Sequence, residues 1–450
     1  MLILLSAIRA RWRDLLDGFW FVPGLISLWG PVLALLCVWI DSRLGPIHAP
    51  FFFTGNATAA SGVLSAIAGA VMAVLGLVFS ITIVTLQLVT SQFTPRALRG
   101  FLADRMTQSV AGGFLGLFGY ALLVLTTVHD PVQTGTGFVP VISITVAIGC
   151  SFLGLVLLLL FFHHTAESIQ VFNITAKLAK ETLHALEHLS PPWDDEARRE
   201  QRDSVVPHWE ASSPPQRLCA TRSGYVQSIA FHHLLQVIPH LEPGLRIHLL
   251  VCPGDFVTQE TVILDLWTSS PLRETEITAL RRCVIISNQR DMLQDPGFGM
   301  RQLTDIALRA MSPAVNDPTT AVNCIQYLQV IFERLIRYRI SEVLSQVPGG
   351  TSLLVIRTRT FQEYLGVFVE IGRVTTDNAR VADALLSALE AVARIACEQA
   401  REHLPLLWTV VQAIALPALQ GTQTDVDRTL LQEHLMCLER ILHADGACLG

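Results

Sequence analysis

The amino-acid sequence predicts an α-helical membrane protein with four transmembrane helices, followed by a cytoplasmic α+β region. The first observation is composition: 51% of the 450 residues are hydrophobic and 16% are charged, whereas about 25% are charged in a typical soluble protein. The second is that residues 1–165 contain seven Arg and five Asp but no Lys and no Glu. Most of the charge lies further on, so we expect an apolar first third joined to a soluble remainder.

Four apolar segments define the predicted membrane domain, residues 1–165, and none of them contains a charged residue. They cover residues 19–40, 61–92, 108–128 and 138–162. About 20 helical residues cross a hydrocarbon layer of about 30 Å, so each segment is long enough to span it. Helix is expected because backbone groups in lipid must be hydrogen-bonded within the segment.

The basic residues near the segment ends predict the orientation. Eight of them lie in the N-terminal flank, between the second and third segments, and after the fourth segment. The other two loops contain one basic residue, Arg43. The eight are Arg9, Arg11, Arg13, Arg96, Arg99, Arg105, Lys177 and Lys180. Because basic residues gather on the cytoplasmic side, both termini are predicted to be cytoplasmic.

The second segment combines small and polar residues in a helical pattern. Gly62, Gly69 and Gly76 are seven residues apart and share a helix face, which favours close helix packing. The candidate pore-lining residues follow them: Ser80, Thr82, Thr85, Gln87, Ser91 and Gln92. In one interpretation these groups bond across helices or to their own backbone. In the other, several copies of the chain bring this helix together around a water-filled pore.

Two smaller features lie at the ends of the segments. Arg96 and Arg99 are three residues apart and are predicted either to anchor the chain at lipid headgroups or to attract anions at a cytoplasmic pore mouth. His163 and Glu167 are four residues apart on one helix face, where an interfacial hydrogen-bonded pair is expected rather than a metal site.

The cytoplasmic part is predicted to have three regions. They are a helical extension with a Pro-rich linker at 166–216, a small β module at 217–268, and an α+β, largely helical domain at 269–450. Three β-rich runs at 224–230, 245–251 and 261–267 are separated by Pro-Gly turns. Strand character returns at 352–357 and 367–371, and a helical tail is expected from about residue 377 to 443.

A polar cluster is predicted in the stretch from residue 295 to 320. Its members are Arg301, Asp305, Arg309, Asn316 and Asp317. The first three are successive i, i+4 neighbours on a helix, and Asp317 or Thr319 is suited to cap the helix that follows. The plain interpretation is two capped helices joined by a turn, and the functional one is a concave pocket for a ligand.

Several classes of protein are disfavoured. The net charge of −6 argues against a nucleic-acid partner. The nine Cys are odd in number and never spaced as Cys-x-x-Cys, so neither disulfides nor a metal site is expected. The sequence has no nucleophile elbow, no kinase motif set, no His-Glu-x-x-His and no dinucleotide fingerprint, so we expect no cofactor and no enzyme activity. An unrecognised membrane enzyme is the third interpretation.

Four stretches resemble a bacterial family described as a predicted membrane protein, domain of unknown function number twenty-two fifty-four. They are Phe79–Arg96, Gly224–Gln227, Pro253–Val257 and the pair Gln294–Gly299 with Ser312–Ala321. The resemblance implies a location in the bacterial inner membrane and the same order of domains. It implies no activity and no functional residues.

The sequence favours a homo-oligomeric passive pore for ions or small solutes, with the second transmembrane helix as its lining and a possible preference for anions. Its expected partners are the lipid bilayer and other copies of the chain. The alternative is a membrane-anchored interaction or sensory protein whose cytoplasmic region binds a partner or ligand. The absence of charged residues inside the segments disfavours proton-driven transport.

Overall fold

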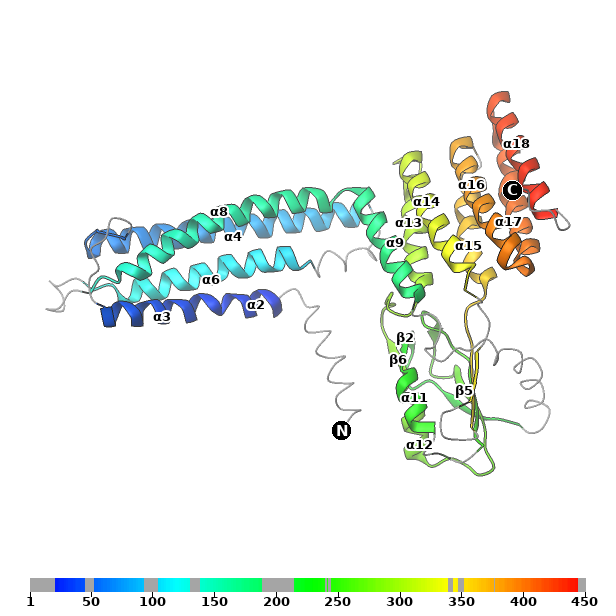
Figure 1. Ribbon diagram of the computed structural model, residues 1–450, viewed down its shortest axis with the longest axis horizontal. Coiled ribbons are helices and arrows are strands. Elements are labelled where there is room, and N and C mark those ends of the chain that lie inside the picture. The colour runs from blue at the N-terminus through cyan, green and yellow to red at the C-terminus, as the bar shows by residue number, and fades with distance from the viewer. Residues whose placement is uncertain are drawn as a thin grey trace. The chain divides into compact units, whose positions relative to one another are not determined.

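The computed structural model describes residues 21–44, 52–92, 104–129, 138–187, 214–238, 241, 244–338, 343–346, 352–375 and 377–443. The chain forms two compact units, Met1–Asn173 and Ile174–Gly450. Figure 1 shows long helices in the first unit and strands with shorter helices in the second.

The first unit is a bundle of apolar helices. They are α2 (Phe21–Ser27), α3 (Trp29–Leu44), α4 (Ala57–Gln92), α6 (Arg105–Thr127) and α8 (Val141–Ser168). α6 is the most enclosed, since it contacts each of the other four. Glycine makes this packing possible: a Cβ on Gly30 would overlap the Gly116 carbonyl oxygen, and one on Gly112 would lie 2.9 Å from the Pro23 backbone.

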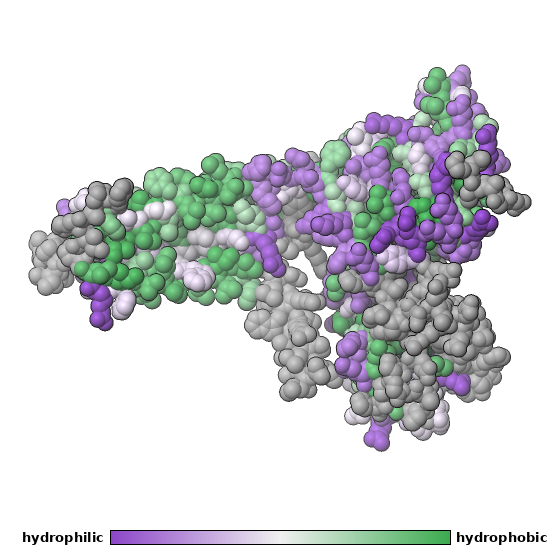
Figure 2. Space-filling model, in the orientation of Figure 1, coloured by the Kyte–Doolittle hydropathy of each residue, from purple (hydrophilic) through white to green (hydrophobic). Residues whose placement is uncertain are grey.

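The outer surface of this bundle is hydrophobic. Figure 2 shows hydrophobic residues along the helices of the first unit, and Trp29, Leu35, Phe152 and Leu159 are each more than half exposed. In water such a surface would drive aggregation, whereas in a bilayer it contacts hydrocarbon.

Within the described residues, five helices are long and apolar enough to cross a membrane. Four lie in the first unit, at Phe21–Leu44, Ala57–Leu88, Arg105–Thr127 and Val141–Ser168, and the fifth is Arg401–Gly421. The predicted count of four is therefore not confirmed. The fifth covers η2 (Arg401–His403) and α17 (Leu404–Gly421), which packs against α15, α16 and α18 in the second unit.

The second unit contains two small sheets. One has the order β1-β5-β3-β8-β7 and the other β4-β2-β6. The strands are β1 (Gln216–Cys219), β2 (Gly224–Ile229), β3 (Arg246–Leu249), β4 (Phe256–Val257), β5 (Val262–Trp267), β6 (Val284–Ser287), β7 (Val343–Gln346) and β8 (Leu353–Ile356). All pairs are antiparallel except β3 with β8. The sheets thus extend beyond the predicted range 217–268, because β6, β7 and β8 join them.

Helices complete the second unit. They are α9 (Val171–Glu187), α11 (Phe231–Val237), α12 (Glu274–Arg281), α13 (Pro296–Ala310), α14 (Pro318–Leu335), α15 (Phe361–Arg373), α16 (Ala379–Gln399), α17 and α18 (Asp425–His443). The prediction of a strand at 367–371 is wrong, since these residues belong to α15. Thr360 and Glu363 form a capping box that starts this helix, and Phe361, Leu365 and Phe368 form its buried face.

Candidate functional site

One face of α4 points away from the rest of its own bundle. We call it the α4 face and define it by Gly62, Gly69, Ala73, Gly76, Ser80 and Gln87, all of which are exposed. A Cβ added to any of its three glycines would meet nothing within 4 Å. The opposite side of α4 supplies Leu64, Val71 and Val78 to the bundle core. The two patterns noted separately in the sequence, small and polar, therefore lie on the same exposed surface.

The other candidate lining residues on α4 lie elsewhere. Thr85 is buried within the bundle, and the half-buried Thr82 donates a hydrogen bond to the Val78 carbonyl oxygen at 2.8 Å. Both positions fit the interpretation in which these hydroxyls bond across helices or to their own backbone. Ser91 and Gln92 belong to the last turn of α4, and their side chains lie outside the described residues.

The predicted pore mouth, Arg96 and Arg99, also lies outside the described residues. Beside it in the chain, Asp104 caps α6 by accepting hydrogen bonds from the Thr107 N–H and hydroxyl. His164 of α8 lies 3.1 Å from the Asp104 carboxylate. Burial acts to raise the pKa of Asp104, but the Thr107 hydrogen bonds and His164 outweigh it and lower the pKa. The predicted pair of His163 and Glu167 is present, exposed, at 3.4 Å.

At the other end of the helices, Asp41 of α3 holds the start of α8. It is buried, and its carboxylate accepts hydrogen bonds from the N–H groups of Ile142 and Ser143, both at 2.9 Å. It also accepts one from the Ser143 hydroxyl at 2.7 Å. Asp41 thus caps α8 from another helix, at a position that sequence reasoning treated only as a segment boundary.

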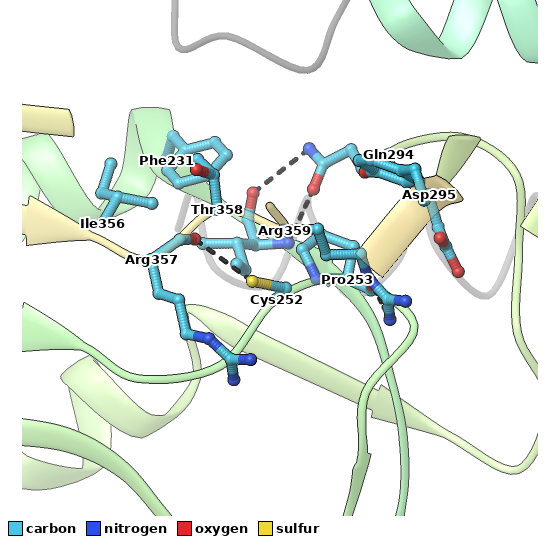
Figure 3. A pocket seen from close by; sticks show the side chains of 11 residues that line it. Phe231, Cys252, Pro253, Gln294, Asp295, Ile356, Arg357, Thr358 and Arg359 are labelled. Atoms are coloured by element: carbon cyan, nitrogen blue, oxygen red, sulfur yellow. Dashed lines mark hydrogen bonds between the residues drawn. The ribbon is translucent and has the colours of Figure 1, made fainter. Parts of the chain in front are cut away.

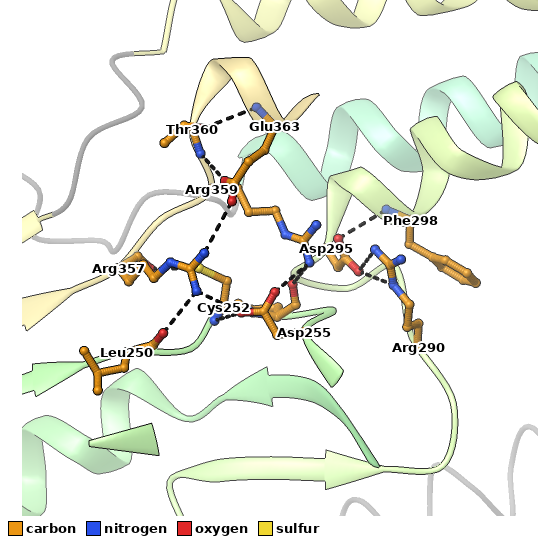
Figure 4. Close-up of polar contacts among 11 residues, drawn as sticks. Leu250, Cys252, Asp255, Arg290, Asp295, Phe298, Arg357, Arg359, Thr360 and Glu363 are labelled. Atoms are coloured by element: carbon orange, nitrogen blue, oxygen red, sulfur yellow. Dashed lines mark hydrogen bonds and ion pairs between the residues drawn. The ribbon is translucent and has the colours of Figure 1, made fainter. Parts of the chain in front are cut away.

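In the second unit, two of the motif stretches, Pro253–Val257 and Gln294–Gly299, meet at a group of charged residues (Figure 4). We call it the charge cluster and define it as Asp255, Arg290, Asp295, Arg357, Arg359 and Glu363. Asp295 caps α13 through the Phe298 N–H and pairs with Arg290 at 2.6 Å. Burial raises the pKa of Asp295, with Arg290 and Arg359 acting against it.

The remaining members of the charge cluster connect the sheet to α15. Asp255 accepts from Arg359 at 3.0 Å and lies 3.5 Å from Arg357, which also reaches Glu363 at 3.3 Å. Gly254 lies against Asp295 with φ of +88°, and a Cβ there would lie 2.1 Å from the carboxylate. The contact between Gly254 and Asp295 therefore requires glycine in the motif at 253–257 opposite the aspartate of the motif at 294–299.

A pocket beside the charge cluster is too small for a ligand. Cys252, Gln294, Asp295, Arg357 and Arg359 are among its lining residues (Figure 3). Its cavity volume is about 30 Å³, whereas ligand sites usually have about 300–1,000 Å³. Gln294 closes one wall, since it accepts from the Ile229 N–H at 2.8 Å. The arrangement can hold water and fix the sheets to the helices.

The polar cluster predicted on 301–317 does not form one pocket. Arg301 pairs with Asp305 at 2.9 Å and with Glu370 of α15, while Asp317 caps α14, as predicted, through the Thr320 N–H. Asn316 adopts φ of +48° in the turn between α13 and α14. About 13 Å of helix separates Arg301 from the end of α13. Arg309, half-buried, lies in the last turn of α13. The plain interpretation, two capped helices joined by a turn, is the one the structure has.

The apolar bundle, with several helices long and apolar enough to cross a membrane, is that of a multi-pass membrane protein, and it is joined to a second unit built on two sheets. The chain belongs to the family described as "Predicted membrane protein (DUF2254)", whose family model matches residues 17–391. This confirms the resemblance seen in the motifs.

Relatives of this chain occur in mycobacteria. The chain is 31% identical to uncharacterized protein Mb1321c of Mycobacterium bovis and to uncharacterized protein Rv1290c of Mycobacterium tuberculosis. Each match extends over 403 residues and covers 86% of this chain and 74% of the relative. No solved structure matches the chain.

Proposed function

We propose that several copies of this chain pack around the α4 face and enclose a passive pore for ions or small solutes. Ser80 and Gln87 line the end of this pore that lies nearer residue 92. In this proposal the first unit supplies all four membrane spans, in the bacterial inner membrane, with both termini cytoplasmic. The helix α17 then serves as a core helix of the soluble bundle.

The observation that carries the proposal is the exposure of Gln87 and Ser80 on a helix face whose earlier part carries the small residues Gly62, Gly69, Ala73 and Gly76. The Gln87 amide has two donor hydrogens and an acceptor oxygen to satisfy. An unsatisfied polar group in hydrocarbon costs several kcal/mol, so this face is expected to contact water or protein. Gly62, Gly69 and Gly76 allow a second α4 to approach closely.

Flux through liposomes that contain the purified protein tests the proposal. We expect anion and cation flux from the parent chain, reduced severalfold by Gln87→Leu and by Ser80→Ala. Thr126→Val is the matched control, since it removes an exposed hydroxyl on α6 and should leave flux unchanged. A preference for anions would further implicate Arg96 and Arg99.

The rival function is a membrane-anchored interaction or sensory protein. An assembled oligomer that passes no ion or solute under any gradient, pH or membrane tension would reject the pore. The search would then move to partners of the soluble unit.

A further inference from the structure

A second feature of the first unit is an apolar groove between α4 and α8, floored by α6. Ala66 and Ala70 line it from α4, Phe152 and Leu155 from α8, and Phe114 and Leu117 from α6. Its volume is about 450 Å³. Gly154 of α8 lies close to this floor, because a Cβ there would lie 3.2 Å from the Phe114 ring.

The shape of the groove suits one thin occupant. Its α4 wall runs from Val63 to Val74, a distance of about 16 Å at 1.5 Å per residue. The volume spread over this length gives a mean cross-section of about 30 Å², whereas a helix about 10–12 Å in diameter has a cross-section of about 80–110 Å². A single hydrocarbon chain fits this width and a second helix does not.

The chemistry of the groove is that of hydrocarbon. Ser151 is the one polar side chain among its described lining residues, and its hydroxyl donates to the Ala147 carbonyl oxygen at 2.8 Å. All the lining residues lie within the candidate spans of α4, α6 and α8. Phe152 and Leu155, at the rim, are 66% and 57% exposed. The groove therefore opens toward the medium that surrounds the spans, which is the acyl-chain layer.

We propose that this groove is a binding site for one acyl chain of a membrane phospholipid, which stays bound while the surrounding lipids exchange. The acyl chain fills a space that the side chains of α4, α6 and α8 leave empty. It makes the dispersion contacts that an empty groove would lack. None of the residues that define the α4 face lines the groove.

Photo-crosslinking with a chase tests the site. The full-length protein is equilibrated with phosphatidylethanolamine and phosphatidylglycerol vesicles that contain a trace of phosphatidylglycerol with a photoreactive acyl chain. It is then chased with unlabelled vesicles and illuminated. We expect crosslinks that survive the chase to map to residues 63–74 and 148–158. Ala70→Phe fills the groove and should reduce them about tenfold, a loss of about 1.4 kcal/mol in binding.

The experiment includes one control variant and one replacement for the test variant. Leu159→Phe adds bulk at an exposed α8 position outside the groove and should leave the crosslinks unchanged. Ala66→Leu, a smaller change, replaces Ala70→Phe if that variant does not fold. Crosslinks spread evenly over the exposed helices, or unaffected by filling the groove, would overturn the proposal. So would disulfide-linked dimers specific to Ala70→Cys, because they would place a second copy there.

Discussion

At Gly254 the backbone adopts φ of +88°, a region that L side chains rarely enter, and the Asp295 carboxylate occupies the place of a Cβ. Each residue is therefore fixed by the other. Asp295 is 1% exposed, and it combines a cap on α13 with the ion pair to Arg290. Removing one partner of a buried ion pair costs about 3–5 kcal/mol, more than a surface pair contributes. We therefore expect substitution of a single residue of the charge cluster to lower the free energy of unfolding substantially.

We expect Gly254→Ala to lower the free energy of unfolding by about 2 kcal/mol or more, because it adds both backbone strain and a clash with Asp295. Gly366→Ala on α15 is the matched control, since a Cβ there meets nothing within 4 Å. Alanine in a helix interior should stabilise by about 0.5–1 kcal/mol. Thermal unfolding of the purified variants measures both. Equal melting temperatures would contradict the placement of Gly254 against Asp295.

At the scale of elements, helix ends explain how the segments are joined. α13 and α14 each begin with Asp-Pro, where Asp295 and Asp317 accept from the helix N–H groups and the proline takes the first helical position. α8 lacks a side-chain cap of its own, since Pro140 precedes it. The cap comes instead from Asp41 on α3, which joins two membrane helices at their ends.

Asp41→Ala removes this cap and leaves the N–H groups of Ile142 and Ser143 without their acceptor. We expect the membrane unit to lose about 2 kcal/mol of stability, at the upper end of the range for a lost cap. The midpoint of thermal unfolding in detergent measures the loss. Asp41→Asn, which keeps an acceptor oxygen, should fall between the parent and Asp41→Ala, and an unchanged midpoint for both would count against the cap.

Glu390 connects α16 to α18 through His434 at 2.8 Å and pairs with Arg394 on its own helix. Burial acts to raise the pKa of Glu390, but Arg394 and His434 outweigh it and lower the pKa below its ordinary value of 4.5. A carboxylate with a lowered pKa stabilises the fold above its ordinary value and loses this contribution as the pH falls through the folded value. We therefore expect unfolding to become easier below about pH 4.5.

Denaturant unfolding of the full chain at pH 7, 5 and 4 measures this dependence. Glu390→Gln should flatten the acid side of the curve, and Glu398→Gln, an exposed change on the same helix, should leave it as in the parent. An acid slope that is the same in all three proteins would exclude Glu390 as its source.

For the whole molecule, the α4 face is the surface on which the proposed assembly depends. A Cβ added to its glycines, Gly62, Gly69 or Gly76, would meet nothing within 4 Å, and Ser80 and Gln87 continue the same face. Large apolar residues cover other exposed positions, such as Leu153, Leu159 and Leu160 on α8. Lipid suits the α8 surface, and close protein contact suits the α4 face.

Gly69→Leu should therefore prevent assembly, since its side chain would hold neighbouring α4 helices apart. Gly149→Leu is a matched control, because Gly149 is also an exposed helical glycine with nothing within 4 Å. Light scattering of the protein in detergent gives the number of copies. We expect an oligomer for the parent and for Gly149→Leu, and a smaller species for Gly69→Leu. A parent chain that is already monomeric would remove the basis for a pore.

Local patterns in the sequence determined the four candidate membrane spans of the first unit, the strands β2, β3, β5 and β8, and the cap at Asp317. These features depend on neighbouring residues, because helical and strand periods and capping act over a few positions. The prediction of a strand at 367–371 was wrong for the same reason, because it used only neighbouring residues. Its run of β-branched residues favoured a strand locally, while the Thr360–Glu363 cap and packing of Phe361 and Phe368 against Phe332 favour a helix.

Only the tertiary structure decided which side chains meet. Asp41 and Ser143 are 102 residues apart in sequence, and Gly254 meets Asp295 across three strands and a helix. The sequence placed six polar residues on the second helix, but its packing against α6 buried Thr85 and left Ser80 and Gln87 exposed. A helical pattern defines faces, and only the neighbouring helices determine which face is covered.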